Sequence, residues 1–204
     1  MQYFDTKLFG EVFVTLTVIM DPLGTVPAFL ALTSGRTERA RKRLAWQAVL
    51  TAAVVIGVFA IFGQSILSYL GITLPALQGA GGLLLLLVAL ELLTGRMSDP
   101  IEVRDVNVAL VPLGTPLLAG PGAIVATIVF VKGAHHTGAY LAIIAALLAV
   151  HLVLYSALRF SVVLIRVIKD SGISLLTRIF GLLLSAIAVQ LVANSIRAFI
   201  LQGK

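Results

Sequence analysis

Two short stretches rich in proline and glycine lie inside apolar segments of this chain, and both carry groups that could bind a small molecule. The first runs Asp21-Pro22-Leu23-Gly24-Thr25-Val26-Pro27, and the second runs Thr115-Pro116-Leu117-Leu118-Ala119-Gly120-Pro121-Gly122. Proline breaks a helix, and within a membrane such a break survives only where it is buried in protein or lines a cavity. The candidate substrate-binding residues are therefore Asp21, Pro22, Gly24, Thr25, Pro27, Thr115, Pro116, Gly120, Pro121 and Gly122.

Both stretches are predicted to restart a helix. Asp21-Pro22 and Thr115-Pro116 each place an N-cap side chain before a proline at the first helical position. A helix N-terminus carries unpaired N–H groups and about half a positive charge, so it favours an anionic group such as a carboxylate. If the two restarted half-helices both begin at mid-membrane, a carboxylate could bind between them.

Asp21 is the one carboxylate near the middle of an apolar segment, where an ionisable group is costly and usually functional. Three roles remain open for it: it could hold a substrate ammonium, carry a proton in a coupled cycle, or only cap the second half-helix. Two positive helix ends and one carboxylate suit a zwitterion better than an anion or a cation alone. A small amino acid fits that description.

The composition indicates that lipid is the solvent for most of the chain. Hydrophobic residues make up 59% of its 204 residues and charged residues 12%, whereas soluble domains carry about 45–50% apolar and about 25% charged residues. The net charge of +6 is spread over the joints between apolar runs, which favours membrane orientation over a nucleic-acid partner. There is no cysteine, and no hydrolase, zinc-protease or nucleotide-loop motif. We therefore expect neither an enzyme nor a cofactor or metal.

We expect an all-α integral membrane fold with six transmembrane helices, of which helices 1 and 4 are broken. The six apolar segments lie at about 8–32, 44–68, 73–94, 107–131, 138–165 and 173–201. Each is long enough to cross a hydrocarbon core of about 30 Å, and the longer ones must tilt or protrude.

An internal repeat relates the two halves of the chain. The third and sixth segments share spacing as well as composition, because Gly82-Leu83-Leu84-Leu85 with Ala89 and Glu91 corresponds to Gly181-Leu182-Leu183-Leu184 with Ala188 and Gln190. We therefore divide the chain into a first three-helix repeat, 1–95, a cytoplasmic linker, 96–106, and a second three-helix repeat, 107–204. Because each unit has three helices, the two must be inverted relative to one another, a pattern typical of secondary transporters.

The orientation follows from the distribution of lysine and arginine. With the N-terminus outside, only four of the fifteen basic residues stay outside: Lys7, Lys132, Arg197 and Lys204. The positive-inside rule therefore predicts that both termini are outside.

Other polar residues in the segments are weaker candidates. Glu91 and Gln190 are candidate gate or coupling residues, although Glu91 could simply reach the interface and Gln190 could hold helices together. His151 is the one histidine inside a segment, and an inter-helix hydrogen bond is the alternative to a proton relay there.

The two proline-containing stretches, together with the run from Gly181 to Gln190, resemble the MarC family of bacterial and archaeal inner-membrane proteins. The resemblance covers nearly the whole chain, including its length and six-segment layout. It implies an integral membrane protein with six spans, and some members are described as transporters of small neutral amino acids such as glycine and alanine.

The favoured hypothesis is a secondary transporter for a small neutral amino acid or a similar solute, which works by alternating access in the inner membrane of a bacterium or archaeon. The coupling ion could be a proton or sodium. The protein could also form an oligomer in the lipid. The alternatives are a channel-like exporter of another small solute and a membrane scaffold that transports nothing.

Overall fold

The computed structural model describes residues 4–94 and 118–202, and every regular element in these two ranges is a helix. Several of these helices begin with a hydrogen bond from a backbone N–H of the first turn to the side chain of the residue before the helix. The Asp5 carboxylate accepts a hydrogen bond from the Leu8 N–H at 2.9 Å at the start of α1, and the Thr37 hydroxyl accepts one from the Ala40 N–H at 3.3 Å at the start of α3. The elements are α1 (Thr6–Met20), α2 (Thr25–Leu32), α3 (Glu38–Tyr69), α4 (Leu74–Thr94), α5 (Pro121–Gly133), α6 (Thr137–Arg159) and α7 (Ser161–Gln202).

Four helices are long and apolar enough to cross a membrane: α3, α4, α6 and the part of α7 from Ser171 to Leu201. The pair α1 and α2 passes the same test as one broken span, with a bend of 46°. Only 22–44% of the apolar windows in the four long helices is buried inside the molecule, so most of their apolar side chains face outward. The all-helical, multi-pass class of the fold is confirmed, and so is the break in the first segment.

The fourth predicted segment is described only in part. Its second half forms α5, which has 13 residues and is shorter than the about 20 residues that a span needs. Residues 107–117 lie outside the described ranges, as does the predicted linker at 96–106.

One predicted boundary is wrong. The fifth segment was expected to continue to residue 165, but α6 ends at Arg159, and Phe160 has non-helical backbone angles. The helix that follows contains a further kink at Lys169, where φ is 61° and ψ is 163°. The apolar stretch therefore bends twice between α6 and the last span, which a hydrophobicity pattern cannot reveal.

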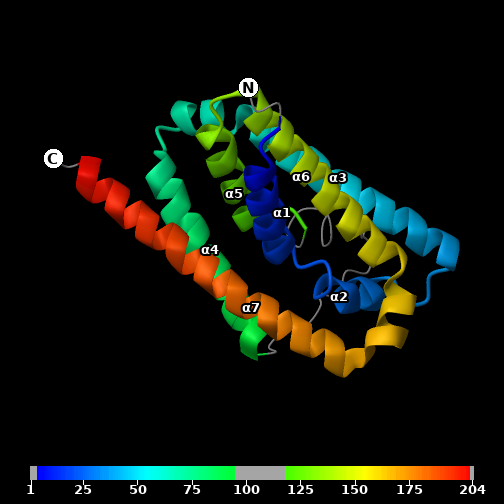
Figure 1. Cartoon of the computed structure of the whole chain (residues 1–204). Coiled ribbons are helices and arrows are strands. Elements are labelled where there is room, and N and C mark those ends of the chain that lie inside the picture. The colour runs from blue at the N-terminus through cyan, green and yellow to red at the C-terminus, as the bar shows by residue number, and fades with distance from the viewer. Residues whose placement is uncertain (1–3, 95–117, 203–204) are drawn as a thin grey trace.

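The helices pack around α1, which lies at the centre of the molecule (Figure 1). It contacts α5, α6 and α7, while α3 contacts α5 and α6, and α4 pairs along its length with α7. The larger core cluster joins residues of α1, α2, α3, α5 and α6, and a smaller cluster lies between α4 and α7 beside Val18 and Ile19 of α1.

Glycines allow these helices to approach closely. A Cβ at Gly81 of α4 would lie 2.6 Å from Val125 of α5, and one at Gly63 of α3 would lie 2.6 Å from Ile128. Tight contact through small residues is the usual way in which helices associate in lipid.

Candidate functional site

The first break is built around Asp21, which ends α1 in the left-handed backbone region with φ 37° and ψ 71°. Its N–H donates to the Thr17 carbonyl at 3.1 Å, and its own carbonyl accepts from the Thr25 N–H at 3.1 Å. A turn at Pro22, Leu23 and Gly24 connects the two helices. The Thr25 hydroxyl donates to the Pro22 carbonyl at 3.1 Å, which closes this turn.

The Asp21 side chain lies inside the protein and is only partly satisfied. The residue is 5% exposed. Its Oδ1 accepts a hydrogen bond from the Gly24 N–H at 3.0 Å, whereas Oδ2 is buried and has no hydrogen-bond partner in the part of the chain that the structure describes. No ion pair among the described residues includes Asp21. A buried carboxylate oxygen without a donor is costly, so this atom is the one at the break that a ligand or a proton would stabilise.

Gly24 is required by the position of that carboxylate. A Cβ on Gly24 would overlap Oδ2 of Asp21 and lie 2.7 Å from its Cγ. The backbone of Gly24 is ordinary right-handed helix, with φ −67° and ψ −26°. Its role is therefore to leave space for the Asp21 side chain rather than to adopt an unusual conformation.

The predicted helix start in the first stretch needs a correction. Asp21 was expected to cap a helix beginning at Pro22, but α2 begins at Thr25 with Gly24 as its N-cap, and Asp21 is the C-cap of α1. The left-handed backbone at Asp21 ends α1 there, and the next helix begins three residues later than predicted. Its carboxylate still accepts a backbone N–H of the following turn. Pro22 is buried and Pro27 is partly buried within α2.

The second break is described from Leu118 onward. Leu118 and Ala119 are buried and non-helical, Gly120 is the N-cap of α5 in an extended conformation, and Pro121 occupies the first turn. Thr115 and Pro116, where the restart was predicted, lie outside the described ranges. Pro121 is exposed, while Gly122 is buried so closely that a Cβ there would overlap Leu85 of α4.

The two breaks share one core. Met20, the last residue of α1, belongs to the same buried cluster as Leu118, Ala119 and Ala123, and α1 contacts α5. That the N-termini of α2 and α5 face one another across a ligand stays a prediction.

Glu91 and Gln190 lie on exposed faces of α4 and α7. The Gln190 side-chain amide donates to the Asn194 side-chain oxygen at 2.9 Å, one turn further along the same helix. The structure therefore does not bring these two candidates into the buried polar region around Asp21.

Two further polar groups, on α1 and α6, are buried without a partner, and of these only His151 was considered from the sequence. Thr17, one turn before Asp21, has a buried hydroxyl with no partner in the described part of the chain, and the same holds for Nε2 of His151 on α6. The signal for Thr17 was its spacing of four residues from Asp21, which places both on one face of α1. His151, for which the sequence left an inter-helix hydrogen bond or a proton relay open, bonds instead through Nδ1 to the Leu147 carbonyl oxygen of its own helix at 2.7 Å.

A groove of about 460 Å³ lies elsewhere, between α3 and α6, and Ile61, Gln64 and Tyr140 are among the residues that line it. It contains none of the candidate residues. Several of its side chains are exposed on the apolar outer surface, so we interpret it as part of the lipid-facing surface. Among the residues that the structure describes, no cluster of three metal-ligating side chains occurs.

Comparison with known proteins identifies the family. The family model described as "MarC family integral membrane protein" matches residues 6–200. A UPF0056 membrane protein of Methanocaldococcus jannaschii is 38% identical over 97% of this chain and 100% of its own length. The UPF0056 membrane protein YhcE of Escherichia coli is 30% identical over 96% of this chain and 94% of its own, and one of Aquifex aeolicus is 35% identical over 93% and 92%. No solved structure matches. The chain belongs to the MarC family of integral membrane proteins.

Proposed function

We propose that this protein is a secondary transporter of a small neutral amino acid, such as glycine or alanine, that works by alternating access. The observation that carries the proposal is Asp21, a carboxylate that is 5% exposed at a break in a membrane-spanning helix and has one oxygen without a partner in the described ranges. Intramembrane carboxylates of this kind mark substrate or ion pathways.

The chemistry of the breaks favours a zwitterion. Asp21 supplies an acceptor for an ammonium group, and the positive end of the α5 dipole, at Gly120 and Pro121, favours an anionic group such as a carboxylate. Close packing at Gly24 and Gly122 leaves little space beside either break. A substrate with a side chain no larger than a methyl group suits these constraints.

Contacts between α4 and α7 support the inverted repeat. A Cβ at Gly82 would lie 2.8 Å from the Ala188 carbonyl oxygen, and one at Gly181 would lie 3.3 Å from the Ala89 carbonyl oxygen. Gly181 and Ala188 occupy the same repeat positions as Gly82 and Ala89. The glycine of each repeat therefore faces the alanine of the other repeat. Such reciprocity is expected of a two-fold interface.

The helix pairings follow the same rule. The first helix of unit one, α1, packs on the second helix of unit two, α6; correspondingly, α5 of unit two packs on α3 of unit one. The contacts of α4 with α7, of α3 with α6 and of α1 with α5 join equivalent helices. We therefore propose six spans in two inverted units that rock about the α4–α7 pair, as in other transporters built this way.

The proposal includes the membrane location and the orientation of the protein. We place it in the inner membrane of a bacterium or archaeon with both termini outside, acting on a small solute without enzymatic chemistry, and using a proton or sodium gradient. In Figure 1 the start of α1, the α3–α4 joint and the α5–α6 joint lie together at the top. The basic residues at the start of α3, Arg39, Arg41, Lys42 and Arg43, lie at the opposite end.

The test is uptake and counterflow of labelled glycine and alanine by the protein in liposomes. We expect saturable uptake that is accelerated by unlabelled alanine inside, and a loss of at least tenfold in Asp21→Asn, because a charge-assisted hydrogen bond is worth about 1.5–3 kcal/mol. Pro121→Ala should also slow uptake.

Asp5 provides a matched control. Its carboxylate accepts a backbone N–H three residues ahead, from Leu8 at 2.9 Å, just as Asp21 accepts one from Gly24, but Asp5 lies at the outer end of α1. Asp5→Asn should transport normally. Equal effects of Asp5→Asn and Asp21→Asn would reduce Asp21 to a turn-forming residue. Non-saturable flux without counterflow would favour a channel, and no flux by a folded protein would favour a scaffold.

A further inference from the structure

We propose that the start of α3 and the end of α6 together form a binding site for the phosphate group of an anionic phospholipid. Lys42 of α3 and Arg159 of α6 hold the phosphate, and Trp46 lies one turn further into the membrane along α3. The site does not depend on which solute the protein transports. Only the leaflet, the inner one, follows from the proposed orientation.

The packing of α3 on α6 brings the two helix ends together. The ring centroids of Trp46, near the start of α3, and Tyr155, near the end of α6, lie 5.7 Å apart in an edge-to-face contact. At the other ends of the same two helices, Gln64 of α3 and Tyr140 of α6 line one groove. The helices are therefore antiparallel, and the first turns of α3 lie against the last turns of α6.

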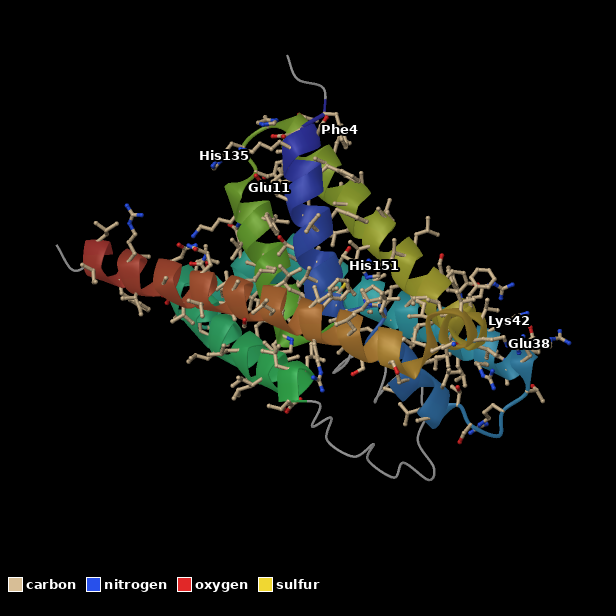
Figure 2. The ribbon with its side chains drawn as sticks, turned by 60° about the horizontal axis from the view of Figure 1, so that its bottom comes forward. Phe4, Glu11, Glu38, Lys42, His135 and His151 are labelled. Atoms are coloured by element: carbon tan, nitrogen blue, oxygen red, sulfur yellow. The ribbon has the colours of Figure 1, made fainter. Side chains whose placement is uncertain are left out.

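The charged groups at this end carry a surplus of positive charge. The Glu38 carboxylate forms an ion pair with Lys42, one turn further along α3, and Figure 2 shows both residues at the end of the molecule away from Phe4. The positive charges of Lys42, Arg41 and Arg159 all act on Glu38. Arg159 forms no ion pair of its own within the described part of the chain. One carboxylate thus faces three cations, which leaves an anion to be supplied from outside.

Aromatic rings position the Arg159 guanidinium. Its Cζ lies 6.0 Å from the centroid of the Tyr155 ring and 5.9 Å from that of the Phe160 ring, within the distance of about 6 Å at which a cation is attracted to an aromatic face. A ring has no lone pair to accept from the guanidinium, so the N–H donors stay available. Their fork matches two oxygens of a phosphate.

An exposed apolar stripe favours a lipid over a soluble phosphate. Trp46, Leu50 and Val54 recur every four residues along α3 and are 53%, 46% and 56% exposed, so they share one outward face of the helix. This stripe begins one turn beyond Lys42 and leads into the apolar span. Tryptophan is enriched at the level of the lipid headgroups. A phosphate between Lys42 and Arg159 therefore places the acyl chains of its lipid along the stripe.

The test measures dissociation constants of phosphatidylglycerol and phosphatidylcholine, from the rise of the thermal midpoint of the purified full chain in an uncharged detergent. Phosphatidylglycerol is anionic, whereas phosphatidylcholine carries its own cation beside the phosphate. We expect phosphatidylglycerol to bind more tightly. Arg159→Gln should raise its dissociation constant about tenfold, because charge-assisted hydrogen bonds are lost.

Arg178 provides a matched control. It is also an exposed arginine, but it lies on α7 one turn before Gly181, which packs on α4. Arg178→Gln removes the same charge and should change the dissociation constant by less than about twofold, because salt screens a distant exposed charge. Basic residues that only set the orientation of the protein attract anionic lipid through diffuse charge, and the two variants would then have equal effects.

Glu38→Gln gives a result that does not depend on how Arg159→Gln folds. The Glu38 side chain is 77% exposed, so its replacement leaves the packing intact. Without the competing carboxylate, Lys42 and Arg159 are both free for the phosphate. Phosphatidylglycerol should therefore bind about threefold more tightly to this variant than to the wild-type protein.

The lipid site is refuted if the two lipids stabilise the wild-type protein equally, or if Arg159→Gln and Arg178→Gln weaken phosphatidylglycerol binding to the same extent. Weaker binding to Glu38→Gln would also refute it. If inorganic phosphate stabilises the protein as strongly as phosphatidylglycerol, with the same dependence on Arg159, the site binds a soluble anion and the lipid assignment is wrong.

Discussion

Gly24→Ala tests whether the Asp21 carboxylate is held where the structure places it. The backbone angles of Gly24 suit alanine, so the added methyl group acts only through the space that it occupies. That space is filled by Oδ2 of Asp21, and the Cγ of Asp21 would lie 2.7 Å from the new Cβ. The carboxylate must rotate away, which breaks its 3.0 Å hydrogen bond from the Gly24 N–H.

The size of the effect follows from these contacts. Breaking this hydrogen bond leaves the buried Asp21 oxygen without a donor, which should cost about 1–3 kcal/mol. Alanine also lowers the conformational entropy of the unfolded chain relative to glycine, which should stabilise the protein by about 0.4–1 kcal/mol. We expect a net loss of about 1–2 kcal/mol, which lowers the thermal midpoint by about 2–8 °C for a protein of this size. Alanine binding should weaken in parallel.

The assay is a double-mutant cycle with Asp21→Ala, followed by thermal unfolding in one detergent. Once the carboxylate is absent, Gly24→Ala should be neutral or slightly stabilising, so the cycle should give a coupling energy of about 1–2 kcal/mol. Gly10→Ala is the control, because nothing lies within 4 Å of its added Cβ. Equal costs of Gly24→Ala with and without the Asp21 carboxylate would refute the reasoning.

Three further outcomes are expected from the packing between α4 and α7. Gly82→Ala should destabilise the protein by about 1–3 kcal/mol through overpacking against the Ala188 carbonyl, measured by thermal unfolding, whereas Gly57→Ala, with open space around it, should not. Gly181→Ala, whose Cβ has more distant neighbours, should cost less than Gly82→Ala in the same assay. Ser195→Ala should cost about 0.6–1.7 kcal/mol, because its hydroxyl donates to the Pro75 carbonyl at 2.7 Å in a buried contact between the two helices.

The broken first helix could be predicted from the sequence because its cause is local. Proline and glycine in an apolar segment interrupt the backbone hydrogen bonds whatever the rest of the chain does. The α4–α7 pairing was not predicted. The equal spacing of Gly82 and Ala89 with Gly181 and Ala188 indicated a repeat, but it did not say that these two helices pack against one another.

The details of the site could not be predicted, because they depend on backbone conformation and on packing between helices. Asp-Pro is a common helix start, so the left-handed conformation that makes Asp21 a C-cap had no sequence signal. The kink at Lys169 occurs at a residue that does not favour positive φ, and so the bend before the last span was missed.

Alternating access to the break can be measured most directly with a single cysteine. The chain contains no cysteine, so Thr25→Cys introduces a unique thiol at a buried position, 6% exposed, beside Asp21. Thiol reagents that cannot cross the membrane are applied from either side of sealed vesicles. We predict labelling from both sides, with alanine changing the two rates in opposite directions. A thiol that reacts from one side only, or from neither, with no effect of alanine would contradict the proposed transport mechanism.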